Sequence, residues 1–67
     1  MDDMSQYGRA SILAGETVVR LQQEGHSADE AKHMVNAVIN AEEFAVTTGR
    51  HTFDLTLFSE RLNQLPE

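Results

Sequence analysis

The segment from Gly25 to Glu30 constrains the fold more than any other part of the sequence, because it marks the end of one helix and the start of another. Glycine suits the left-handed conformation in which many helices end, and Gly25 supplies it here. Ser27 and Glu30 have the spacing of a capping box, whose hydroxyl and carboxylate satisfy amide groups that the first helical turn leaves free. The sequence therefore predicts a helical hairpin that turns at residues 24–27.

Residues 5–24 form the predicted first arm of this hairpin. Their apolar side chains recur at spacings of three and four, as on one face of a helix: Tyr7, Ala10, Ala14, Val18 and Leu21. Gly8 and Gly15 lie inside the arm, and each costs about 1 kcal/mol relative to alanine. With Ser11 or Ile12 they form a side of little bulk, which another helix can approach closely. Alternatively, the helix begins only after Gly8 or bends at Gly15.

Residues 28–47 form the predicted second arm. Asp29 and Glu30 are favourably placed at its positive end, and Gly49 is placed to end it. Its apolar positions make a stripe wide enough to contact two neighbours rather than one: Ala31, Met34, Val35, Val38, Ile39, Ala41, Ala45 and Val46.

A shorter third helix is predicted after a cap at Thr52 or Asp54, and it ends before Pro66. Leu55, Phe58, Leu62 and Leu65 repeat on one of its faces, and Phe53 is placed to pack against Phe58 or a near neighbour as a staple. The alternative is a strand over residues 52–58, where apolar and polar residues alternate. A single strand has nothing in this chain to pair with, so we favour the helix.

These elements predict an all-α fold over residues 1–67, a single domain in which a long helical hairpin carries a short third helix. A chain of 67 residues buries a small core, and small domains are commonly reinforced by a disulfide, a metal or a partner subunit. The sequence contains no cysteine. We therefore expect a homodimeric helical bundle.

The net charge and the lengths of the apolar runs limit which partners and which cellular location we expect for the chain. Eleven acidic against five basic residues give a net charge of −6, which repels nucleic-acid phosphates and anionic lipids alike. No apolar run is long enough to span a bilayer, and the first four residues carry acids where a secretory signal carries bases. We expect a cytoplasmic protein with no direct nucleic-acid partner and no membrane partner.

No pattern in the sequence names a reaction, so we predict a non-enzymatic protein without catalytic residues, cofactor or metal. Asp29, Glu30 and His33 share one side of a helix and could hold a divalent ion, but no second ligand pair accompanies them. Glu42 and Glu43 point about 100° apart on a helix and do not form an acid–base pair. We expect them on the helix surface; the alternative is a carboxylate at a subunit contact, meeting Arg50 or Arg61.

The hairpin does not fit a DNA-binding helix-turn-helix. The second predicted helix starts with acidic residues, whereas a recognition helix carries basic or amide side chains near its start. Several aliphatic residues fall beside the main stripes and either widen the core or form a subunit surface: Ile12, Leu13, Val19, Met34, Ile39 and Leu57. The candidate interface residues are Gly8, Ile12, Gly15, Val19, Met34, Val38 and Ile39.

Two functional hypotheses follow from these features. The first is a protein–protein interaction or regulatory module that docks on another protein, as a homodimer with a four-helix core. The second is an acidic antagonist, such as an antitoxin, an immunity factor or a phage-type inhibitor, that blocks a basic nucleic-acid-binding surface. Binding by the antagonist would weaken steeply with salt, whereas docking through aliphatic surface would not.

Overall fold

A computed structural model describes the backbone of residues 2–66 and the side chains of residues 5–66. Three helices follow one another, α1 (Asp2–Gln23), α2 (Ala28–Thr47) and α3 (Leu55–Asn63). The predicted all-α hairpin with a short third helix is confirmed, and the alternative strand over residues 52–58 is wrong. Asp54 caps α3, since its Oδ1 accepts a hydrogen bond from the Leu57 amide at 3.1 Å.

The α1–α2 turn forms at the predicted glycine, with the serine half of the predicted capping box in place. Gly25 has a φ of +109°, and the amides of Gly25 and His26 donate to the carbonyls of Gln22 and Leu21. Ser27 Oγ accepts the Glu30 amide at 3.1 Å. The Glu30 carboxylate differs from the expected reciprocal cap: its Oε1 lies 3.0 Å from His26 Nδ1.

The end of α2 repeats this arrangement. Gly49 has a φ of +78°, its amide donates to the Val46 carbonyl, and the Arg50 amide donates to Ala45. The chain then leaves the helix and crosses to α3 through residues 51–54, which have no regular secondary structure.

Helix α1 is continuous through both of its glycines, so the alternative in which it begins only after Gly8 is wrong. A Cβ added at Gly8 or Gly15 meets nothing within 4 Å. No helix of the same chain therefore uses the space that these residues leave open.

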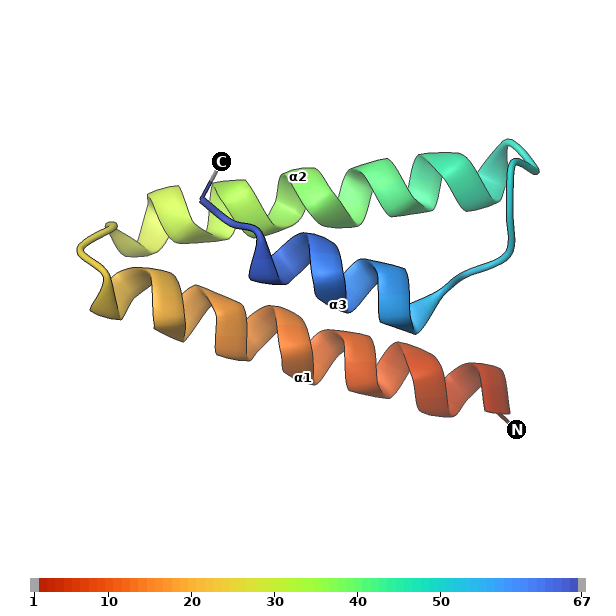
Figure 1. The fold of residues 1–67 in the computed structure, drawn as a ribbon, viewed down its shortest axis with the longest axis horizontal. Coiled ribbons are helices and arrows are strands. Elements are labelled where there is room, and N and C mark those ends of the chain that lie inside the picture. Colours follow the sequence, from red (N-terminus) through yellow and green to blue (C-terminus); the bar gives the residue numbers. More distant parts are fainter. Residues whose placement is uncertain (1, 67) are drawn as a thin grey trace.

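Helix α3 lies between the diverging arms of the hairpin and contacts both (Figure 1). The arms are close at the α1–α2 turn and separate toward the opposite end, where residues 48–54 bridge the gap (Figure 1). The fully buried apolar residues come from all three helices: Leu21, Ala31, Val35, Phe58 and Leu62. Arg20 joins α1 to the end of α3, because its Nη2 donates to the Leu62 carbonyl at 3.0 Å.

Within residues 2–66, none of the helices combines the length and the apolar character needed to cross a lipid bilayer.

Candidate functional site

The seven predicted interface residues fall into two separate groups. Gly8, Ile12, Gly15 and Val19 lie along the outer face of α1, with Ile12 61% and Val19 52% exposed. Met34, Val38 and Ile39 on α2 are instead partly buried against the core. The structure brings the first group into one stripe and directs the second group inward.

The other predicted surface aliphatics divide in the same way. Leu13 and Leu57 are both partly buried, and Leu13 packs against the core cluster, which favours its role in widening the core. Two exposed aromatic residues were not predicted as surface: Tyr7 is 52% and Phe44 61% exposed. The Arg50 guanidinium lies over the Phe44 ring, 5.7 Å from the ring centroid, so a cation covers part of this aromatic face.

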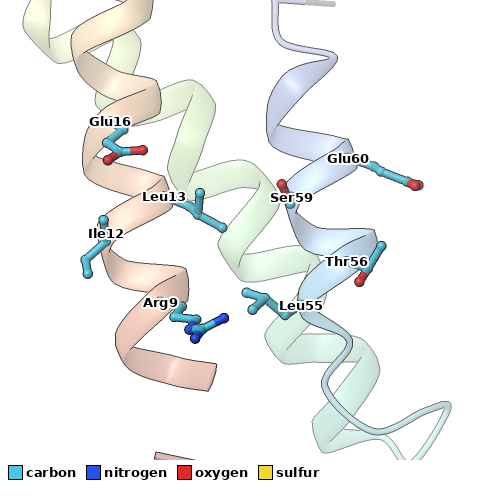
Figure 2. Close-up of a pocket in the computed structure, with 8 residues that line it drawn as sticks. All are labelled: Arg9, Ile12, Leu13, Glu16, Leu55, Thr56, Ser59 and Glu60. Atoms are coloured by element: carbon cyan, nitrogen blue, oxygen red, sulfur yellow. The ribbon is translucent and has the colours of Figure 1, made fainter. Parts of the chain in front are cut away.

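A groove of about 480 Å³ runs between α1 and α3 (Figure 2). Leu13 and Leu55 point toward each other across it, whereas Ile12 points away from α3 (Figure 2). Arg9 and Glu16 stand along the α1 side. The groove is shallow and mixed in polarity, which suits the edge of a protein contact better than a small-molecule site.

A second cleft, of about 590 Å³, lies between α1 and α2 at the end where the arms diverge. Its volume falls within the range of about 300–1,000 Å³ that is usual for small-ligand sites. Apolar residues from each element make up most of its lining: Tyr7, Ala10 and Ala14 of α1, Ile39 and Val46 of α2, Phe53 and Phe58.

Three aromatic residues of this cleft contact one another in series, with their rings tilted by 32° and 53° between neighbours. The Tyr7 and Phe53 ring centroids are 5.1 Å apart, and the Phe53 and Phe58 centroids are 5.8 Å apart. These distances are typical of favourable aromatic pairs. The predicted contact between Phe53 and Phe58 is confirmed.

Glu42 is the unusual member of the cleft lining. It is 3% exposed, and neither of its carboxylate oxygens has a hydrogen-bond partner among the described residues. The basic group within 4.0 Å of it, among side chains 5–66, is His51, whose Nε2 lies 3.6 Å from Oε2. This distance is longer than a hydrogen bond.

The expectation that Glu42 lies on the helix surface is therefore wrong, and its nearest base is His51 rather than Arg50 or Arg61. Sequence spacing contained the signal. Glu42 follows Val35, Val38 and Ile39 by seven, four and three residues and so continues the apolar stripe of α2. Glu43, next in sequence, is exposed as expected.

The possible metal ligands do not converge on one point. Asp29, Glu30 and His33 are all exposed, and the Glu30 carboxylate is engaged by His26. Among the described residues, no group of three histidine, aspartate or glutamate side chains is arranged to hold a metal ion.

No protein-family model, curated protein or solved structure matches this chain.

Proposed function

We propose that the protein is a non-enzymatic interaction module that forms a homodimer through the outer face of α1 and acts by docking on another protein. The observation that carries this proposal is the stripe of Gly8, Ile12, Gly15 and Val19, in which two open glycines alternate with two exposed aliphatic side chains. A soluble helix gains nothing from two internal glycines, which weaken it by about 1 kcal/mol each. Close packing against a second helix offsets that loss.

The spacing of the stripe makes it complementary to itself in an antiparallel pair. Its residues follow one another by steps of four, three and four. With a two-fold axis midway between residues 13 and 14, Gly8 lies opposite Val19 of the partner subunit, and Ile12 lies opposite Gly15 of the partner subunit. Each aliphatic knob then meets a position without a side chain, as an isologous interface requires.

Charges beside the stripe agree with the same register. Arg9 and Glu16 flank it on one side, and neither forms an ion pair with another described side chain. In the antiparallel pair, Arg9 of each copy lies beside Glu16 of the partner subunit, giving two symmetric ion pairs. Such pairs contribute little energy but favour one orientation over the other.

Sedimentation velocity across a concentration series tests the dimer. We expect the wild type to dimerise and Ile12→Glu to remain monomeric with unchanged helix content, because the two introduced carboxylates, one from each copy, would be buried in a dry interface. Asn36→Glu adds the same charge on an exposed position of α2 and should leave dimerisation intact. A wild type that stays monomeric at the highest concentration would refute the dimer.

The docking function is tested by affinity capture from the native host at low and high salt, with the wild type and Ile12→Glu as baits. Aliphatic docking predicts a protein that stays bound at high salt and is lost with Ile12→Glu. The acidic antagonist is the second hypothesis, and it predicts a basic, nucleic-acid-handling protein that is released at high salt from both baits. That second result would contradict the docking module.

A further inference from the structure

The buried carboxylate of Glu42 lacks the partners that a buried charge requires. Burying an unpaired ionised group is strongly unfavourable, and folded proteins almost always give such a group a counter-charge or hydrogen bonds. Here both oxygens expose less than 1 Å² and accept no hydrogen bond from the described residues. The His51 ring, 3.6 Å from Oε2, faces one of the two oxygens beyond hydrogen-bond length.

The surroundings of this carboxylate are those of a binding site rather than of a packed core. Glu42 lines a cleft of about 590 Å³ whose other walls are chiefly aliphatic and aromatic. The two acidic residues of the lining are Glu42, which is buried, and Glu43, which is exposed, and acidic groups at one side of an apolar cleft orient a ligand with one positively charged end and one apolar body. The paired rings of Tyr7 and Phe53 add faces that attract a cation.

We propose that the cleft between α1 and α2 binds a primary ammonium group carried on an unbranched apolar stem. The ammonium donates hydrogen bonds to the Glu42 carboxylate, and the stem lies against Ile39, Val46 and the aromatic rings. The same chemistry occurs in a free alkylamine and in the lysine side chain of a partner protein.

The choice of an ammonium follows from the shape of the site. Both of its oxygens are covered, so a ligand reaches them only when neighbouring residues move aside, and a compact ammonium needs a smaller opening than a planar guanidinium. A divalent metal ion requires several oxygen or nitrogen ligands, and no group of three is present among the described residues. Entry is easiest beside Phe53 and His51, because residues 51–54 have no regular secondary structure to disrupt.

This site is independent of the proposed dimer. Of the α1 residues that line the cleft, Tyr7, Ala10 and Ala14 lie on a different side of the helix from the stripe that begins at Gly8, and Ser11 lies between the two sides. Turning about 100° per residue, the two sets of side chains diverge by roughly a quarter of a turn or more. Failure of one proposal therefore leaves the other standing.

Titration of the ¹⁵N-labelled full chain with hexylamine, followed by NMR, tests the proposal. We expect shifts concentrated at Tyr7, Glu42 and Phe53, and little binding of 1-hexanol, which has the same stem without the charge. Glu42→Gln should weaken hexylamine binding by about tenfold or more, because it removes the charged partner and keeps the shape. Glu60→Gln makes the same charge change on α3 outside the cleft and should alter the affinity less than about twofold.

A second ligand separates the two sources of the ammonium group. If N-acetyl-lysine methylamide binds at least as tightly as hexylamine, the natural ligand is a lysine side chain of a partner; if hexylamine alone binds, it is a free amine. Either result supports the site. The proposal is overturned if hexylamine and 1-hexanol bind equally, if neither amine shifts the cleft resonances, or if Glu42→Gln and Glu60→Gln weaken binding equally. The comparison of hexylamine with 1-hexanol uses the wild type and so does not depend on the folding of a variant.

Discussion

The two ends of the helical hairpin differ in how their polar groups are satisfied. At the α1–α2 turn, the amides of Gly25 and His26 find carbonyl partners, Ser27 caps α2, and Arg20 reaches the end of α3. At the diverging end, Glu42 is buried without a hydrogen bond beside an open cleft. The first end has the features of a stabilising element, whereas the second keeps an unfavourable group where a ligand could satisfy it.

The largest expected effect on stability comes from removing a buried side chain near the α1–α2 turn. Leu21 is 0% exposed, and Leu21→Ala should lower the free energy of unfolding by about 2–5 kcal/mol, enough to unfold much of a domain this small. Leu55→Ala removes the same atoms from a partly buried position near the diverging end of the hairpin and should lower the free energy of unfolding by less. Urea unfolding followed by circular dichroism measures both. Equal losses of unfolding free energy would show that the two ends stabilise the fold equally and would contradict the difference described above.

A smaller change in unfolding free energy, of opposite sign, is expected at the diverging end of the hairpin. Glu42→Leu replaces an unsatisfied buried carboxylate with an apolar side chain that fits the stripe of α2, so we expect a gain in unfolding free energy of about 1–3 kcal/mol. Glu43→Leu removes the same charge from an exposed neighbouring position and should change stability by no more than about 0.5 kcal/mol. A loss of stability in Glu42→Leu would mean that the carboxylate is satisfied in solution.

This contrast also explains which features the sequence could predict. Gly25, Ser27 and Asp54 act on amides within a few residues of themselves, so local spacing was enough to predict their roles. The burial of Glu42 depends on the segment with Phe53 and His51 folding back between α1 and α2, which is a tertiary event. The sequence shows that one of Glu42 and Glu43 borders the apolar stripe of α2, but this position alone does not distinguish a buried carboxylate from a surface one.

The outer face of α1 differs from both ends of the hairpin in how far the sequence predicts it. Its glycines and aliphatics were predicted as an interface, and the structure leaves Gly8, Ile12, Gly15 and Val19 uncovered within one chain. The single chain leaves these residues exposed, and a second copy would cover them. The dimer therefore stays a prediction.

The smallest expected change in stability gives the sharpest test of that prediction. Gly15→Ala places a Cβ where nothing of the same chain lies within 4 Å, so in the monomer it should raise the unfolding free energy by about 0.5–1 kcal/mol through helix propensity. In the dimer the same methyl group stands opposite Ile12 of the partner subunit and should weaken association. We expect a higher Tm for dilute protein together with a larger dissociation constant by sedimentation. Ser5→Ala, at an exposed position of α1 outside the stripe, should leave the dissociation constant unchanged. If Gly15→Ala stabilises the monomer and leaves association intact, the glycines do not serve close helix packing, and the outer face of α1 is an ordinary solvated surface.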